Sequence, residues 1–418
     1  MTIFNTFRSL DRDKRRNLSL LFSANLLFWT SLTSLLPTLP IYIEDIGGTT
    51  TQVGLVMGSF AIGLICSRTG LGYLADGYSR TLVVRIGMLV ATLAPIGYLL
   101  VQSIWPLIAV RTFHGISLAA FTTGYSTLVI DLSPIKQRGQ LIGYMNLGAP
   151  IGMAIGPAMG TFLKESRGYQ LFFLTTACIG FWGYLLASQI QEKPRNRNIS
   201  FDSTISDVPP RNFRQLLSSP SILVPTLILL LIGLVFGTLM AFLPLFLRET
   251  ALGLSAGLFY TTVAVASFIM RVVSGQASDR YGRGLFITIS LVCYVTSMGL
   301  LTQAHSYRDL LLGAIFEGMG AGILIPMMIS LISDRSSPSE RGRVYSVCMG
   351  GFDLGLAIAG PILGILGQMI SYRSMFALDG SLATIAMIIF MSRSNKSLKH
   401  SLGFALGQEK DLYSQSKN

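Results

Sequence analysis

Apolar segments recur along the whole chain, and short polar breaks separate them. A helix needs about 20 mainly apolar residues to cross the hydrocarbon core of a bilayer, and every segment reaches that length. The pattern therefore predicts an all-α membrane protein with twelve transmembrane helices. Their expected ranges are 18–43, 51–75, 81–102, 105–130, 140–163, 169–190, 221–247, 255–277, 284–304, 309–332, 343–369 and 372–392.

The composition excludes an ordinary soluble domain. Of the 418 residues, 51% are hydrophobic and only 12% are charged, whereas soluble domains carry about 25% charged residues. The four cysteines lie inside apolar segments without a Cys-x-x-Cys pair, so we expect neither a disulfide framework nor a metal site. No Gly-Lys pair is present, and an ATP-binding phosphate loop requires one.

The net charge of +12 follows the expected membrane topology. Most of the 32 lysines and arginines fall in breaks that share one side with the amino terminus, such as Arg12–Arg16 and Arg335–Arg343. Because positive loops mark the cytoplasmic side, we expect both termini in the cytoplasm. The positive charge then indicates a lipid bilayer as partner and not a nucleic acid.

A polar stretch rich in proline and serine, residues 191–220, interrupts the series after the sixth segment. We interpret it as a cytoplasmic linker that contains a short helix at 211–217. It divides the chain into a six-helix bundle at 1–190 and a second at 221–392. Residues 393–418 are polar and are expected to form a flexible cytoplasmic tail.

The two halves repeat a charged corner. "GYLADGYSR" (72–80) and "GQASDRYGR" (275–283) place Asp76 and Asp279 a distance of 279 − 76 = 203 residues apart. The same shift aligns further pairs: Arg68 with Arg271, Gly115 with Gly318, Asp131 with Asp334, and Arg138 with Arg341. A shift of 204 aligns Pro40 with Pro244 and "GPAMG" (156–160) with "GPILG" (360–364). Two parallel repeats are the architecture of one large class of secondary transporters.

These motifs resemble the major facilitator superfamily, and within it the twelve-span drug/proton antiporters. The loop signature has the form G-x-L-A-D-R-x-G-R. The first copy has Gly77 and Ser79 where that signature has Arg and Gly. "RTFHG" (111–115) resembles the fourth-span motif, "GMAIGPAMG" (152–160) the fifth-span antiporter motif, and "LLPTLP" (35–40) the close of the first span. The resemblance implies two pseudo-symmetric six-helix bundles in a bacterial inner membrane, driven by a proton gradient without a cofactor. We expect a monomer.

The charged corners suit an inner gate that closes in one state and opens in the other, because partly desolvated ion pairs can differ in free energy between two conformations. Topology-setting loop charges are the alternative. The residues of this predicted gate are Gly72, Asp76, Arg80, Asp131, Arg138, Gly275, Asp279, Arg280, Gly282, Arg283 and Arg341.

A run of glycine and proline on the fifth span removes side chains from one helix face and interrupts backbone hydrogen bonds. It favours close packing and a bend. Packing and gating both remain open as its role. The residues are Gly152, Gly156, Pro157 and Gly160, with Gly360, Pro361 and Gly364 at the related positions of the second half.

Ionisable residues deep in a span are costly and usually functional. His114 and Glu317 are equivalent in the repeat and lie near mid-membrane on spans that line the central cavity in the family. We take Glu317 and Asp353 as the leading proton carriers, with His114 and Arg111 in the same relay. A static Glu317–Arg111 pair is the alternative. Asp379 is expected only to pack against its neighbours.

Asn25, Trp29, Phe236 and Met240 on the paired first and seventh spans are the candidates to line the substrate cavity. A mainly apolar cavity suits lipophilic or amphipathic cargo, although these aromatic residues can equally face lipid. We therefore expect proton-coupled export of small molecules. Proton-coupled uptake, facilitated diffusion of a sugar or metabolite, and a transporter-like sensor are the alternatives. An enzyme is not expected, because the three histidines are too scattered for the usual ligand spacings.

Overall fold

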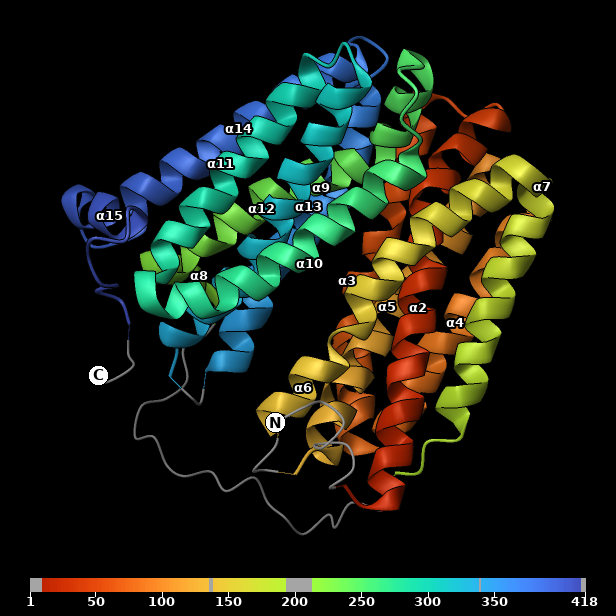
Figure 1. The fold of residues 1–418 in the computed structure, drawn as a ribbon, viewed down its shortest axis with the longest axis horizontal. Helices are drawn as coiled ribbons and strands as arrows, with labels where there is room; N and C mark the ends of the chain where they lie inside the picture. The colour runs from red at the N-terminus through yellow and green to blue at the C-terminus, as the bar shows by residue number, and fades with distance from the viewer. Residues whose placement is uncertain (1–9, 135–137, 193–212, 338–339, 415–418) are drawn as a thin grey trace. The chain divides into compact units, whose positions relative to one another are not determined.

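The computed structural model describes residues 10–134, 138–192, 213–337 and 340–414 (Figure 1). These residues are almost entirely helical, and eleven of their helices are long and apolar enough to cross a membrane. With the labels of Figure 1, the helices are α2 (Arg12–Asp45), α3 (Thr50–Gly77), α4 (Arg80–Leu100), α5 (Ile104–Leu132), α6 (Arg138–Met145), α7 (Gly148–Ser188), α8 (Phe213–Ser218), α9 (Pro220–Thr250), α10 (Ala256–Tyr281), α11 (Arg283–Thr302), α12 (Tyr307–Asp334), α13 (Arg341–Leu366), α14 (Tyr372–Arg393) and α15 (Leu398–Ala405).

Helix α7 consists of two spans joined by a sharp break at Gly168. The backbone of Gly168 has φ 78° and ψ 178°, a conformation that only glycine adopts freely. The predicted fifth and sixth spans therefore meet there, and with this division the eleven long helices become the twelve predicted spans. The predicted short helix at 211–217 corresponds to α8.

The predicted fifth span at 140–163 is itself interrupted between α6 and α7. The amide of Leu147 donates to the carbonyl of Tyr144, three residues earlier, instead of continuing the α-helical ladder. Pro150 follows within one turn and has no amide to donate to Asn146. The glycine- and proline-rich run therefore breaks the helix, where the sequence predicted a bend.

The described helices group into two compact units, which we describe separately. The first contains Met1–Lys193, Met240–Ala264 and Gly360–Gln368, and the second contains Pro194–Leu239, Val265–Ala359 and Met369–Asn418. In the first unit α2 packs against α7, and α5 packs against α3 and α4. In the second unit α11 packs against α12 and α14. Of the predicted linker 191–220, residues 193–212 lie outside the described part of the chain.

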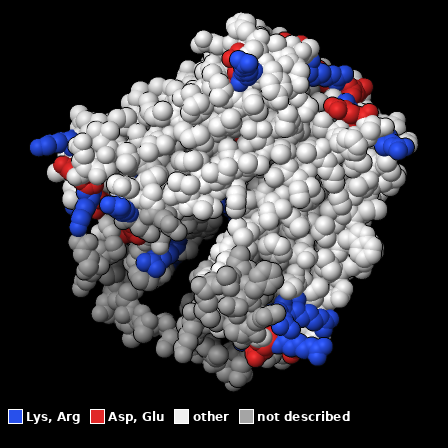
Figure 2. All heavy atoms as spheres, in the orientation of Figure 1, with Lys and Arg blue, Asp and Glu red and all other residues white. Residues whose placement is uncertain are grey.

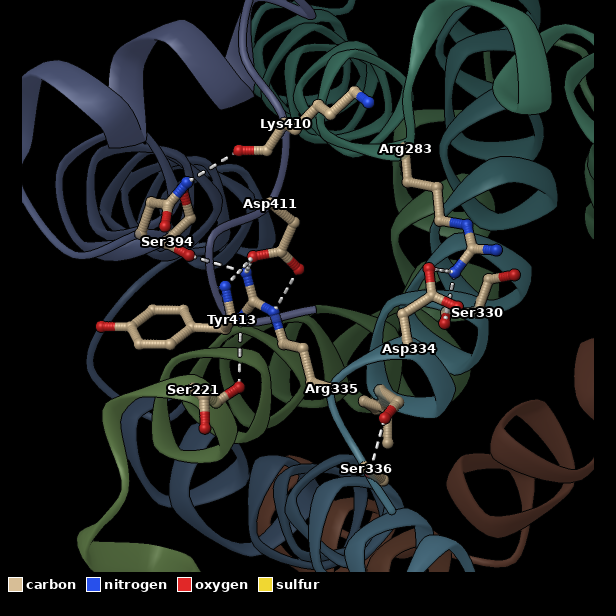
Figure 3. Close-up of polar contacts among 12 residues, drawn as sticks. Ser221, Arg283, Ser330, Asp334, Arg335, Ser336, Ser394, Lys410, Asp411 and Tyr413 are labelled. Atoms are coloured by element: carbon tan, nitrogen blue, oxygen red, sulfur yellow. Dashed lines mark hydrogen bonds and ion pairs between the residues drawn. The ribbon is translucent and has the colours of Figure 1, made fainter. Parts of the chain in front are cut away.

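Where the sequence predicted a flexible tail after residue 393, the structure has a packed segment. Helix α15 contacts α11 and α14, and Asp411 accepts two hydrogen bonds from Arg335 at 2.7 and 3.1 Å (Figure 3). The same guanidinium donates to the carbonyls of Ser221 and Ser394. The segment is polar because it supplies hydrogen-bond acceptors to the buried guanidinium of Arg335.

Charged side chains lie mainly towards the helix ends on the face shown in Figure 2, and the central stretches of the helices carry almost none there. An uncharged band along the helices is the surface expected of a protein that contacts lipid, because charged groups in the hydrocarbon core are costly. The distribution agrees with the membrane-spanning helices that the sequence predicts.

Candidate functional site

The first charge corner consists of Asp76, Arg80, Thr127 and Asp131, where α3 and α5 end and α4 begins. One nitrogen of the Arg80 guanidinium contacts the Asp131 carboxylate and also donates to the Thr127 carbonyl at 3.2 Å. Asp76 is 73% exposed and lies 4.0 Å from Arg80. Asp131 is therefore the main partner of Arg80, and Asp76 is a peripheral one.

The second charge corner consists of Arg283, Ser330 and Asp334 (Figure 3). Its contacts repeat those of the first corner. Arg283 contacts the Asp334 carboxylate and donates to the Ser330 carbonyl at 2.6 Å. Each residue lies 203 positions after its counterpart, Arg80, Thr127 or Asp131. The equivalence predicted from the sequence therefore extends to individual contacts.

The helix that starts at each charge corner, α4 in the first and α11 in the second, begins with a different type of residue. Gly282 starts α11 with φ 86°, which favours glycine. Ser79 starts α4 from an extended backbone, and its hydroxyl accepts from the Leu82 amide at 3.1 Å. Ser79 also donates to Glu192 at 2.6 Å, and the amides of Arg80 and Thr81 donate to the same carboxylate. A serine cap with a carboxylate at the positive end of a helix thus replaces the glycine of the motif.

Glu192 was not predicted as part of this corner. Partial burial acts to raise the pKa of its carboxyl, but the hydrogen bonds from Ser79 and from the amides of Thr81 and Arg80 outweigh this effect and lower it. The contribution of these bonds to stability is therefore complete at neutral pH and is lost as the pH falls.

The remaining predicted gate residues have few contacts in the structure. A side chain added at Gly72 or Gly275 would meet no atom within 4 Å, so close packing does not require glycine at either position. Arg280 is exposed and stacks on Tyr281 at 5.4 Å, and Arg341 is exposed. The side chains of Arg138 and Asp279 lie outside the described part of the structure.

The predicted glycine face of α7 lies directly against α2. A Cβ atom on Gly152 would approach the Leu26 carbonyl to 2.7 Å and Trp29 Cβ to 2.8 Å. On Gly156 and Gly160 it would overlap α2 backbone or hydroxyl atoms. Glycine at every fourth position therefore lets the two backbones approach closely, which is the packing role that the sequence left open.

The related residues of α13 make a similar contact with α3 inside the first unit. A Cβ atom on Gly360 would overlap the Gly54 carbonyl, and Gly364 faces Thr50 and Thr51. The Thr51 hydroxyl donates to the Gly364 carbonyl at 2.8 Å. Pro361 lies between these two glycines within α13.

A charge cluster that the sequence analysis missed lies in the first unit, where α2 and α9 end. We call it the Arg248 cluster, and it comprises Glu44, Asp45, Tyr169 and Arg248. The Arg248 guanidinium lies 2.5 Å from Asp45 and 3.2 Å from Glu44, and the Tyr169 hydroxyl donates to Asp45 at 2.5 Å. Helix α3 runs about 40 Å from this end to the first charge corner, so the two sets of charges lie at opposite ends of the helices.

Asp45 and Arg248 are themselves equivalent in the repeat, because 248 − 45 = 203. The shift of 203 residues could have found this pair, because these equivalent positions carry opposite charges. A cavity of about 500 Å³ lies beside the cluster, lined by Thr38 of α2, Thr161 and Lys164 of α7, and Arg248 and Ser255 among others.

Exchanging the two charges tests whether Asp45 and Arg248 are coupled. Asp45→Arg or Arg248→Asp alone is expected to lower stability by about 1 kcal/mol, because the half-exposed pair is lost and like charges are brought together. The double exchange should recover part of this loss, measured by thermal denaturation of the purified protein. Strictly additive losses in the double-mutant cycle would contradict the coupling.

Arg111, His114 and Tyr98 form a buried polar group in the first unit. The Tyr98 hydroxyl lies 3.0 Å and the Arg111 guanidinium 3.5 Å from His114 Nδ1, and Arg111 stacks over Phe60 at 4.5 Å. Arg111 Nε and His114 Nε2 have no hydrogen-bond partner among the described residues. The structure thus brings together the two predicted relay residues on α5 and adds Tyr98 from α4.

The predicted proton carriers Glu317 and Asp353 lie in the second unit on α12 and α13. Glu317 is 2% exposed, and its Oε2 atom has no hydrogen-bond partner within the described part of the chain. Asp353 is 5% exposed. Both side chains are buried.

The structure does not place Asn25 in an open cavity, which corrects its predicted role. Asn25 is 1% exposed, and its amide donates at 3.4 Å to the carbonyl of Met145, where α6 ends. The Tyr125 hydroxyl donates to the same carbonyl at 2.6 Å. Asn25 therefore helps to satisfy a carbonyl that the helix break has deprived of its usual partner.

The other three cavity candidates are half-buried. Trp29 packs edge-on against Phe28 with the ring centroids 5.8 Å apart, and Phe236 lies 5.7 Å from Phe352. Met240 is also half-buried. These three residues retain partly exposed side chains.

Removing the stronger of the two bonds at the break should weaken the fold measurably. Tyr125→Phe is expected to lower the free energy of unfolding by about 1 kcal/mol, because Met145 then keeps only the longer bond from Asn25. Thermal denaturation of the purified protein measures the change. Tyr184→Phe on the same half is a control, since its hydroxyl has no hydrogen bond within the described residues, and an equal loss in both variants would contradict the assignment.

The helices and their internally repeated charged contacts define a polytopic α-helical membrane protein. A model of the Major Facilitator Superfamily matches residues 21–307 and 255–410, so the chain belongs to this family. The predicted family and fold class are therefore confirmed.

Named relatives of the chain are transporters. The staphylopine export protein of Staphylococcus aureus is 23% identical over 88% of this chain and 94% of its own length. The multi-drug resistance efflux pump PmrA of Streptococcus pneumoniae is 25% identical over 86% of this chain and 91% of its own. The crystal structure of the nucleoside transporter NupG matches with a TM-score of 0.76 and 14% identity over 91% of this chain and 100% of that one, a likeness that shows the fold alone.

Proposed function

We propose that the protein is a secondary active transporter that exports small lipophilic or amphipathic molecules in exchange for protons. One observation carries this proposal: relatives that match 86–88% of the chain are named for export or efflux. The site of action is a bacterial cytoplasmic membrane with both termini inside, and the protein acts as a monomer in the lipid bilayer without a cofactor.

Buried ionisable side chains support the coupling to protons. Glu317, Asp353 and His114 are each 5% exposed or less in membrane-spanning helices. Burial favours the neutral form of such a group, and contact with water or an opposite charge favours its charged form. A transport cycle that alternates these environments takes up a proton on one side and releases it on the other.

The exposed ion pairs support alternating access. In the first unit, the first charge corner lies at one end of the helices and the Arg248 cluster lies at the other. Arg248 and Asp131 are each 50% exposed in their ion pairs, and pairs of this kind contribute only about 0–1 kcal/mol. Contacts this weak can form and break within a cycle. A largely buried pair such as Arg335–Asp411 is costly to open and is suited to a permanent contact.

Everted membrane vesicles from cells that express the protein test the proposal. Ethidium serves as the first probe within a panel of cationic, neutral and anionic compounds. We expect ATP-independent accumulation under an imposed acid-inside gradient, abolished by a proton ionophore and absent from vesicles without the protein. Equilibration that ignores the gradient would indicate facilitated diffusion, and binding without accumulation would indicate a sensor; either result would overturn the proposal.

A further inference from the structure

Asp379 occupies an unusual position in the second unit. It is 0% exposed on α14, about 10 Å from the first residue of that helix. Its Oδ1 atom accepts a hydrogen bond at 3.1 Å from the Thr238 hydroxyl of α9, which is also fully buried. Its Oδ2 atom has no partner among the described residues. The contact therefore joins the seventh and twelfth spans through only one of the two oxygen atoms of the Asp379 carboxyl group.

The first half of the chain makes the same contact without an acid. Ser34 of α2 and Thr176 of α7 lie 3.4 Å apart through their hydroxyls, and both are fully buried. These residues are the repeat equivalents of Thr238 and Asp379, since 238 − 34 = 204 and 379 − 176 = 203. Two neutral hydroxyls thus hold the first and sixth spans together. Packing at this position requires a small polar group and does not require a carboxyl.

Among the described residues, no cation forms an ion pair with Asp379. Helix α14 packs against α11 and α15, and Thr238 belongs to α9. Within the described part of the chain, none of the ionisable groups of these four helices hydrogen-bonds or ion-pairs with Asp379. They are Arg248 and Glu249 of α9, Arg283, Cys293 and Tyr294 of α11, Tyr372, Arg373 and Arg393 of α14, and Lys399 and His400 of α15.

A carboxylate is costly at such a site, because it is desolvated and has only one hydroxyl partner. The related half of the protein shows that a threonine performs the structural task. Packing therefore does not explain why this position carries an acid. A carboxyl group can bind and release a proton, which a threonine hydroxyl does not do.

We propose that Asp379 is a proton-binding residue of the transport cycle, an assignment that rests on the proposed proton-coupled function. It holds its proton while it is buried against Thr238, as in this structure, and releases the proton when the seventh and twelfth spans separate enough to admit water. This proposal goes beyond the expectation that Asp379 only packs against its neighbours.

Infrared spectroscopy tests proton binding without a known cargo. In the purified wild-type protein, we expect a carboxylic acid C=O band that changes with pH and shifts in heavy water. Asp379→Thr should remove one component of the band while it keeps the hydroxyl pair found in the first half. Asp379→Asn, which preserves the shape of the side chain, covers the case in which the threonine variant does not fold. An unchanged band and pH profile in a folded variant would overturn the proposal.

Transport in proteoliposomes tests coupling with the same variants. With ethidium as the probe, counterflow in the absence of a gradient reports whether Asp379→Thr still folds and binds cargo. Accumulation by this variant under an imposed pH gradient should fall to the level of empty liposomes. Gradient-driven accumulation equal to that of the wild type would contradict the assignment. If the wild-type protein itself moves no cargo, the proposed function fails, and the infrared titration still decides whether Asp379 binds a proton.

Discussion

Replacing Asp411 with alanine is expected to lower the free energy of unfolding by about 3–5 kcal/mol, because breaking a buried ion pair leaves an uncompensated charge. The Arg335 side chain is 1% exposed and that of Asp411 is 10% exposed. Arg335 also stacks on Tyr413 at 5.2 Å and on Phe404 at 5.9 Å. Loss of Asp411 should therefore release the segment that carries α15 from the ends of α9, α12 and α14 (Figure 3).

Chemical or thermal denaturation of the purified protein measures this loss. Asp76→Ala is the matched control, since it also removes an aspartate near an arginine, but at 4.0 Å and with 73% of the aspartate exposed. The control should change stability by about 0–1 kcal/mol. A similar effect of the two substitutions would show that the ion pair between Arg335 and Asp411 does not hold the carboxy-terminal segment in place.

Replacing Glu317 with glutamine is expected to abolish gradient-driven export while the protein still folds and still exchanges cargo. Glutamine has nearly the shape of glutamate but binds no proton in the physiological pH range. The side chain is 2% exposed, and its Oε2 atom has no described hydrogen-bond partner, so little packing or bonding is lost. Asp353→Asn should act in the same direction, because that side chain is 5% exposed.

Proteoliposomes with an imposed pH gradient measure this effect, and counterflow without a gradient reports whether the fold and the cargo site survive. Glu249→Gln, at an exposed position near the end of α9, is the control and should transport like the wild type. Undiminished gradient-driven transport by both Glu317→Gln and Asp353→Asn would eliminate these two residues as carriers.

The membrane-spanning helices were predictable because a bilayer of fixed thickness demands long apolar segments. The charge corners were predictable because a repeat places equivalent residues in equivalent contacts. Subtraction of 203 aligned Asp131 with Asp334, and the structure joins each of them to its own arginine. Ser79 stands where the motif has glycine, and Glu192 accepts hydrogen bonds from this serine and from the first amides of α4. The sequence repeat did not predict this role of Glu192.

Contacts between distant segments could not be predicted from local composition. The polar residues after 393 indicated a flexible tail, but a single buried arginine on another helix orders them. Asn25 looked like a cavity residue, although its partner is a carbonyl exposed by a helix break 120 residues later. A carboxyl stands at Asp379 where the first half has a hydroxyl, and this difference could be interpreted only once the structure had shown the contact between Ser34 and Thr176.

The exchange of cargo for protons is tested most directly by following both in one preparation. The purified wild-type protein is reconstituted into liposomes with an acidic lumen and a trapped pH-sensitive dye, and ethidium is added outside. Antiport predicts that ethidium accumulates while the luminal pH rises, and that both signals vanish in Glu317→Gln. Accumulation of ethidium with no change in luminal pH would contradict it.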